Sequence, residues 1–307
     1  MTTVYRNRAL DDPGNHYTFM FANDKSGSVA YQSLPNVTLR VSRPDRYEAL
    51  VEYSTRVSRY DTIRVTSLPR ILPKLSASSA DIVYEFHSSD ERIIEREISE
   101  LDLSLISKIN TPSEFLAGVV RSKLPVEGRG LVEVLPNLVD EVTFAANGPV
   151  PAFNLEDNVV PLVWIGRLDK GKNASDFLRV LSLLPQHYTA IVILSFEDHP
   201  GRMAEFLGLA ASLRVEDKIR IVLNMSQSQI AEIYRYARSR GGLFCSTSLG
   251  ESFGYGVAEA LSSGLSTVSY DVGALSELGP QGGKSRLIPV GDLHGFVDGI
   301  LSEVRSG

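Results

Sequence analysis

The sequence predicts an α/β protein of two domains, each with a parallel sheet. Short apolar segments of strand type alternate along the chain with amphipathic segments of helical period, a pattern typical of parallel sheets covered by helices. The length of 307 residues favours two domains. Residues 144–157 are rich in Pro, Gly and Asn and are interpreted as a linker. We therefore expect domains at residues 1–147 and 148–307, with a ligand-binding cleft between them.

The first domain is predicted to hold a series of short strands. These are expected at 17–22, 36–41, 61–65, 80–86, 103–110 and 131–135. The charged segment 91–101 is expected to be helical. A second helix is expected over 112–120, capped by Thr111, because Pro112 is well suited to a first helical turn.

The second domain shows the same alternation. Strands are expected at 159–165, 189–196, 219–223, 242–246 and 267–271. Helices are expected at 174–184, 201–213, 226–238, 253–263 and 292–304.

Composition narrows the class of protein. With 43% hydrophobic and 22% charged residues, the chain is typical of a soluble globular protein, and a net charge of −6 argues against a nucleic-acid partner. The single cysteine, Cys245, excludes an intramolecular disulfide. The polar N-terminus and the lack of a long apolar run indicate a cytoplasmic protein; peripheral contact with the inner face of a membrane stays open.

The most informative motif lies in residues 248–264. It places Glu251 and Glu259 eight positions apart, with Gly254 and Tyr255 between them at the start of a predicted helix. The free N–H groups of a helix N-terminus bind phosphate, and carboxylates accept hydrogen bonds from sugar hydroxyls. Phosphate flanked by polyols describes a nucleotide sugar.

A basic loop follows the first strand of the second domain. Arg167 and Lys172 lie just after segment 159–165, at the sheet edge where open α/β folds bind ligands, and could clamp a diphosphate. A solvated surface loop is the alternative. Lys170 is a second candidate for the role of Lys172, because only spacing separates the two lysines.

Taken in order, these motifs resemble the retaining glycosyltransferases of family 4, which have the GT-B fold of two Rossmann-like domains facing a central cleft. The resemblance covers roughly residues 159–304. In the first half, segment 84–87 resembles a family strand that ends in a histidine on the acceptor side. The N-terminal domain is abbreviated relative to the family, and the C-terminal domain is the one that binds the donor.

The resemblance implies a role for each candidate residue at the donor nucleotide. Arg167, Lys172 and the backbone N–H groups of Gly254 and Tyr255 would bind the diphosphate. Glu259 would hold the ribose hydroxyls.

The resemblance also implies roles at the sugar and the base. Met225 would contact the base, and Ser252 and Phe253 would shape the sugar pocket. Glu251 would contact the transferred sugar, and His87 would act on the acceptor side. From the residues alone, Glu251 could instead cap the following helix, and His87 could be a structural hydrogen-bonding residue.

The implied reaction is transfer of a sugar from a UDP-, GDP- or dTDP-linked donor to a hydroxyl acceptor, with retention of anomeric configuration by front-face displacement. The acceptor would be a glycan, a lipid-linked glycan or a small metabolite, and neither a metal ion nor a cofactor is expected. A nucleotide-sugar epimerase of the same fold and a non-catalytic nucleotide-sugar-binding protein remain as alternatives. Assembly into a homo-oligomer also stays open.

Overall fold

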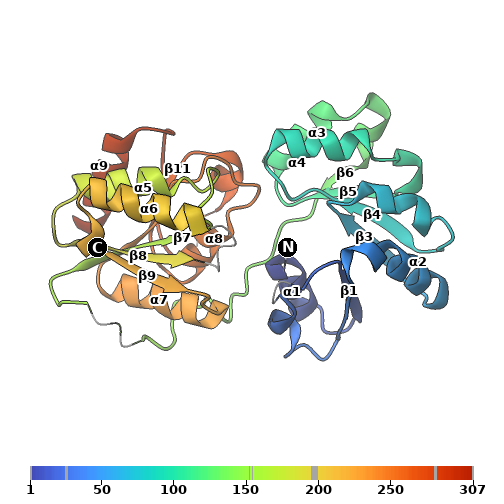
Figure 1. Ribbon diagram of the computed structural model, residues 1–307, viewed down its shortest axis with the longest axis horizontal. Coiled ribbons are helices and arrows are strands. Elements are labelled where there is room, and N and C mark those ends of the chain that lie inside the picture. Colours follow the sequence, from blue (N-terminus) through green and yellow to red (C-terminus); the bar gives the residue numbers. More distant parts are fainter. Residues whose placement is uncertain are drawn as a thin grey trace. The chain divides into compact units, whose positions relative to one another are not determined.

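The computed structural model describes residues 2–24, 27–151, 153, 155–194, 200–279 and 282–305 (Figure 1). The chain divides into two compact units, Met1–Leu138 (unit 1) and Val139–Gly307 (unit 2). The division falls nine residues before the one expected from the sequence.

Unit 1 is an α/β unit with parallel strands. Its regular elements are α1 (Thr2–Asp11), β1 (Tyr17–Phe21), β2 (Val37–Val41), α2 (Tyr47–Val57), β3 (Thr62–Thr66), β4 (Asp81–Glu85), α3 (Glu91–Ser99), β5 (Lys108–Thr111), α4 (Glu114–Lys123) and β6 (Val132–Val134). Four of these strands form a parallel sheet in the order β3-β4-β5-β6, while β1 and β2 form a separate parallel pair.

Several predictions for unit 1 were wrong in detail. The helix expected over 112–120 begins at Glu114, because Ser113 is the cap: its hydroxyl accepts a hydrogen bond from the Leu116 N–H. Thr111 instead ends β5. The segment 103–110 begins with a short 3-10 helix before β5.

Helices α1 and α2 had not been predicted. The buried side of α1 is formed by Val4, Asn7 and Ala9, so a polar residue interrupts the apolar spacing that signals a helix. Asn7 is buried because its side-chain amide donates to the Leu138 carbonyl at 2.7 Å. A polar side chain with a hydrogen-bond partner thus replaces the apolar one that the pattern requires.

Unit 2 alternates strands and helices more regularly. Its elements are β7 (Val160–Ile165), α5 (Ala174–Leu183), β8 (Tyr188–Leu194), α6 (Pro200–Ser212), β9 (Ile219–Leu223), α7 (Gln227–Ser239), β10 (Leu243–Ser246), α8 (Tyr255–Ser262), β11 (Thr267–Tyr270), β12 (Ser285–Ile288) and α9 (Leu293–Arg305). The last two residues of the strand expected at 189–196 lie outside the described residues.

The described strands of unit 2 form one parallel sheet in the order β12-β11-β10-β7-β8-β9. Helices cover both faces (Figure 1): side chains of α5, α6 and α9 share one core with Trp164, and side chains of α7 and α8 share the other with Val163. Consecutive residues of β7 therefore face opposite cores, as the period of two in a strand requires.

The first part of the expected linker belongs to the core of unit 2. Phe144 is fully buried, with its ring centroid 6.1 Å from that of Tyr234 in α7. The Arg235 guanidinium donates to the carbonyls of Thr143, Ala145 and Pro149 at 2.8–3.2 Å. These contacts bind the segment to α7 and explain why the division between units falls earlier than expected.

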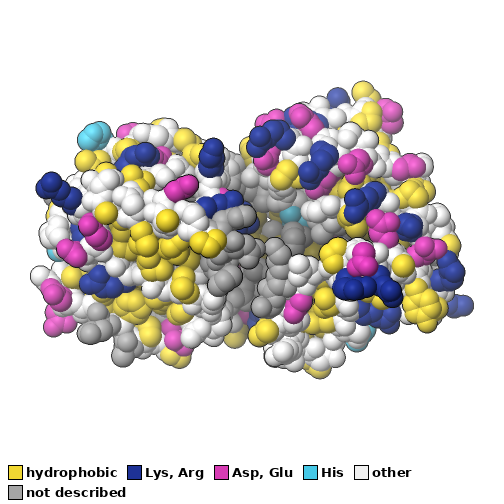
Figure 2. All heavy atoms as spheres, in the orientation of Figure 1, with side chains coloured by type: hydrophobic (Ala, Val, Ile, Leu, Met, Phe, Trp, Pro, Cys, Tyr) yellow, Lys and Arg dark blue, Asp and Glu magenta, His cyan; other side chains and the backbone are white. Residues whose placement is uncertain are grey.

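The surface around α2 is basic, although the chain as a whole is acidic. Figure 2 shows Lys and Arg side chains gathered over this part of unit 1. Arg43, Arg56 and Arg70 are largely exposed, and the last two pair with Glu52 and Glu48 of α2. None of the helices in the described ranges has the length and apolar character needed to cross a membrane. Peripheral membrane contact stays a prediction.

Replacing Phe144 by Ala should destabilise unit 2. The side chain is 0% exposed, so truncation leaves a cavity that costs about 3–5 kcal/mol. Val142, in the same segment, is 89% exposed, and Val142→Ala should change stability by less than about 0.5 kcal/mol. Urea unfolding of the two variants measures both values, and equal effects would contradict the packing described.

Candidate functional site

The order of strands in unit 2 reverses between β7 and β10. The helices that follow these neighbouring strands lie on opposite faces of the sheet, since α5 packs in one core and α8 in the other. In doubly wound sheets, the loops at the carboxyl ends of two such strands diverge and leave a crevice that binds ligands. Here these loops are residues 166–173 and 247–254.

Hydrogen bonds hold the two loops together. The Thr247 hydroxyl donates to the Asn173 carbonyl at 2.9 Å, and it accepts from the Trp164 indole N–H at 3.3 Å. The Leu249 N–H donates to the Gly171 carbonyl at 2.8 Å. Residues on the two loops are therefore fixed relative to one another before any ligand binds.

An ion pair joins the loops at their polar ends. Lys172 Nζ lies 2.6 Å from Glu251 Oε1, with side chains 30% and 14% exposed. Asp169 accepts a hydrogen bond from the backbone N–H of Lys172 at 2.9 Å, which holds the loop at this lysine. Lys170 is exposed on the same loop. The structure thus brings Lys172 and Glu251 together, as candidates from separate motifs.

Arg167 lies on the first of the two loops, with its side chain 70% exposed. The Arg167 Nε donates to Asp169 at 2.7 Å. Burial alone raises the pKa of Asp169, but the hydrogen bonds from Arg167 and from the Lys172 backbone bring that pKa below its usual value. Asp169 is therefore ionised and positions both cationic residues.

The N-terminus of α8 faces the same loops. The helix begins at Tyr255, two residues later than predicted, after Gly254 in the left-handed region at φ +88°. A Cβ on Gly254 would lie 2.3 Å from Leu275, so only glycine fits. The N-cap residue itself, Gly254, has no side chain with which to cap the helix, and Glu251 Oε1 is paired with Lys172. The N–H groups of a first helical turn attract anions.

The sugar-pocket candidates flank this turn. Ser252 and Phe253 are half-buried, and the Phe253 ring packs edge-on against Tyr255 with centroids 5.0 Å apart. The Glu251 carbonyl accepts from the Ala274 N–H at 2.9 Å, which ties the loop to the segment after β11. The structure therefore places Glu251 to Tyr255 in one fixed turn.

Glu259 lies deeper, one turn further along α8. It is 6% exposed, and burial together with the nearby Asp140 carboxylate raises its pKa to about 8. Among the described residues, no donor hydrogen-bonds to its carboxylate. An unpaired buried carboxylate is costly, so a ligand hydroxyl would be a favourable partner. Met225 lies at the same sheet edge after β9, half-buried against the core of α7 and α8.

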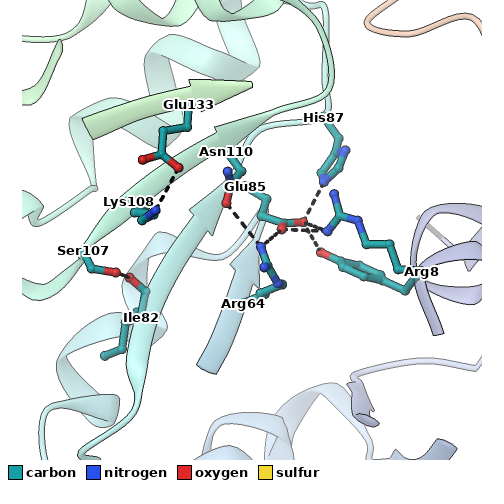
Figure 3. Close-up of polar contacts among 10 residues, drawn as sticks. Arg8, Arg64, Ile82, Glu85, His87, Ser107, Lys108, Asn110 and Glu133 are labelled. Carbon is teal, nitrogen blue, oxygen red and sulfur yellow. Dashed lines mark hydrogen bonds and ion pairs between the residues drawn. The ribbon is translucent and has the colours of Figure 1, made fainter. Parts of the chain in front are cut away.

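His87 belongs to unit 1 and lies in a second polar cluster (Figure 3). Its Nε2 is 3.1 Å from Glu85 Oε2, and its side chain is 10% exposed. The Glu85 carboxylate also accepts from Arg8 and Arg64, at 2.8 and 2.7 Å, and from the Tyr5 hydroxyl at 3.1 Å. Burial raises the pKa of Glu85, but the hydrogen bond from His87 and the charges of Arg8 and Arg64 lower it to about 2.

Sequence reasoning had missed Glu85, Arg8 and Arg64 as site residues. They lie in β4, α1 and β3, up to 77 positions apart, so no local motif connects them. The available signal was Glu85 itself, a carboxylate that directly follows the buried residues Ile82, Val83 and Tyr84, where a charge requires a partner.

Comparisons with known proteins support the family resemblance of unit 2. The family model described as "Glycosyl transferases group 1" matches residues 150–305. The phosphatidyl-myo-inositol mannosyltransferase of Mycolicibacterium smegmatis is 26% identical over 241 residues, which are 74% of this chain and 57% of that protein. One component of the human phosphatidylinositol N-acetylglucosaminyltransferase is 27% identical over 179 residues, which are 58% of this chain and 33% of that protein. The chain thus spans little more than half of the first relative and a third of the second.

Solved structures share the fold along nearly the whole chain. Anabaena HepE in complex with UDP-glucose superposes with a TM-score of 0.78 at 16% identity, covering 98% of this chain and 86% of that one. Sucrose-phosphate synthase from Thermosynechococcus elongatus has a TM-score of 0.76 at 17% identity, covering 98% and 82%. The predicted fold of two Rossmann-like domains is thereby confirmed.

The stability of unit 1 should depend on pH through Glu85. Because its folded pKa of about 2 lies below its usual 4.5, the contribution is complete above pH 4.5 and is lost as the pH falls towards 2. It amounts to on the order of 3 kcal/mol. Urea unfolding between pH 2 and 6 should show a weaker pH dependence for Glu85→Gln. The exposed Glu133→Gln is the control and should match the wild type.

Proposed function

The chain belongs to the family of group 1 glycosyl transferases, whose model matches half of the chain, and we propose that it transfers a sugar from a nucleoside-diphosphate sugar to a hydroxyl acceptor. The observation that carries the proposal is the Lys172–Glu251 pair beside the N-terminus of α8, which begins after Gly254 at the reversal point of a doubly wound sheet. The fold is GT-B, as the sequence resemblance implied.

The diphosphate would bind at the start of α8. Backbone N–H groups after Gly254 and the helix dipole attract phosphate oxygens there. Lys172 can exchange part of its contact with Glu251 for a phosphate oxygen, and the exposed Arg167 can do the same from Asp169. Their positive charges would stabilise the charge that develops on the leaving nucleoside diphosphate.

The sugar, the ribose and the base of the donor would contact the other candidate residues. Glu251, released in part from Lys172, would accept hydrogen bonds from hydroxyls of the transferred sugar beside Ser252 and Phe253. Glu259 would accept from the ribose hydroxyls, and Met225 would contact the base. A UDP-linked donor is the first choice to test, because a UDP-glucose complex has the same fold.

The reaction would proceed by front-face displacement. The acceptor oxygen bonds to the anomeric carbon while the bond to the diphosphate oxygen breaks, and the acceptor proton passes to that departing oxygen. Attack and departure on one face retain the configuration. The charges of Lys172 and Arg167 supply the stabilisation, so the proposal includes no metal ion. A cytoplasmic location stays a prediction.

Incubation with UDP-, GDP- and dTDP-sugars and a panel of hydroxyl acceptors tests the function. We expect release of the nucleoside diphosphate and a product whose anomeric configuration, read by proton NMR, matches the donor. An epimer formed from the donor alone would indicate an epimerase. Donor binding without turnover across the panel would indicate a non-catalytic binding protein.

Substitution of Lys172 should weaken binding of UDP. Lys172→Met removes a charge-assisted hydrogen bond to phosphate, so calorimetry should show an affinity about 10-fold to 100-fold lower. Lys170→Met is the matched control, because this lysine is exposed two residues away, and it should change the affinity by less than about twofold. Equal losses in the two variants would contradict the assignment.

UDP binding should also depend on the ionisation of Glu259. Ribose hydroxyls bind a carboxylate better than a carboxylic acid, so affinity should rise with pH up to about 8, by up to about tenfold per pH unit. Glu259→Gln should lose this pH dependence and retain only the part that comes from the phosphate groups of UDP. Parallel pH titrations of the two proteins would argue against a ribose contact.

A further inference from the structure

A buried carboxylate organises the carboxyl end of β4 in unit 1. Glu85 is the last residue of that strand and is 0% exposed. Side chains of Tyr5 and Arg8 reach it from α1, that of Arg64 from β3 and that of His87 from the residues after β4 (Figure 3). Three parts of the chain therefore meet at one carboxylate.

The carboxylate determines how the His87 ring carries its proton. An ionised carboxylate only accepts hydrogen bonds, so the nitrogen that faces it, Nε2, must carry a hydrogen. In the neutral ring, Nδ1 then holds a lone pair and accepts. The Tyr5 ring packs edge-on against the imidazole, with centroids 6.3 Å apart, which limits rotation of the ring.

The other ring nitrogen has no partner. Within the described residues, His87 Nδ1 is buried and makes no hydrogen bond, and the same holds for Arg8 Nε. Buried polar atoms without partners are rare and cost free energy. An acceptor and a donor left over in one cluster suit a hydroxyl, which both donates and accepts. A fully ionised anion has no hydrogen to donate to Nδ1.

We propose that Glu85 is a positioning residue: it holds His87 in the Nε2–H tautomer, so that Nδ1 accepts a hydrogen bond from a substrate hydroxyl. The tautomer follows from unit 1 alone. The identity of the hydroxyl rests on the proposed sugar transfer, in which it belongs either to the transferred sugar or to the acceptor.

The two arginines support this arrangement. Arg64 contacts Glu85 Oε1 at 2.7 Å and also donates to the Asn110 side chain at 3.2 Å. Arg8 Nη1 donates to both carboxylate oxygens, at 2.8 and 3.0 Å. The two arginines keep the carboxylate ionised, and Oε2 also accepts from Tyr5 and His87. Glu85 therefore acts through His87 and does not need to contact the substrate.

Two-bond proton–nitrogen correlation spectra of the ¹⁵N-labelled protein test the tautomer directly. The chain has five histidines, and the signals that disappear in His87→Gln identify His87. We expect the pattern of an Nε2–H ring with an unprotonated Nδ1. A pattern with the hydrogen on Nδ1 would overturn the proposal, and this result requires no substrate, so it is independent of the proposed function.

Variants then test the role of Glu85. Glu85→Gln presents an amide that both donates and accepts, so the His87 signals should shift towards a mixture of tautomers. The kcat of sugar transfer should fall by about tenfold or more, with a smaller change in KM for the donor, because an incorrect tautomer disables a histidine that is otherwise in place. Glu133→Gln, which removes an exposed carboxylate from the same sheet, should change neither. Unchanged His87 signals in Glu85→Gln would refute the assignment.

Ligand titrations identify the hydroxyl. A shift of the His87 Nδ1 signal with UDP-glucose, absent with UDP, assigns it to the transferred sugar. A shift that requires UDP together with an acceptor that supports turnover assigns it to the acceptor. If neither saturating ligand moves the signal, Nδ1 does not receive a substrate hydroxyl. Failure of UDP to bind at all would instead contradict the proposed function and leave the measured tautomer unaffected.

Discussion

The reversal of strand order between β7 and β10 is the constraint on which the candidate site of unit 2 depends. It sends the helices after the two strands to opposite faces of the sheet, so that their loops part and leave room for a ligand. Thr247 and its partners then fix those loops against one another. Lys172 and Glu251, which are 79 residues apart in sequence, meet only because of this topology.

In both units, cations and carboxylates at the sheet edge pair with one another. Lys172 pairs with Glu251, Arg167 with Asp169, and two arginines with Glu85. Such pairs hold long side chains in place before binding, which lowers the entropy lost when a ligand arrives. The pairs differ in exposure: those in unit 2 reach solvent and can exchange partners, whereas Glu85 is fully buried and retains its own.

Helix termini and the linker show where pattern reasoning succeeded and where it failed. Ser226 begins α7 with a capping box that includes Gln229, a signal contained within four residues. The start of α8 was placed two residues early because Phe253 fits the apolar period but lies in the turn that Gly254 closes. Composition also misplaced the linker. Pro, Gly and Asn are abundant after Phe144, yet the Phe144 ring enters the core, and the carbonyls on either side of it accept hydrogen bonds from Arg235.

The sequence by itself determined the α/β class, nearly every strand and helix of unit 2, and the residue types of the candidate motif at residues 248–264, because these depend on local period and on groups within a few positions. Only the tertiary structure decided which groups meet. It brought Lys172 to Glu251 and left Lys170 exposed, because Asp169 binds the backbone of Lys172. It also joined Glu85, Arg8 and Arg64 from three separate elements. A buried charge needs an opposite charge nearby, and the fold can supply that partner from any distance along the chain.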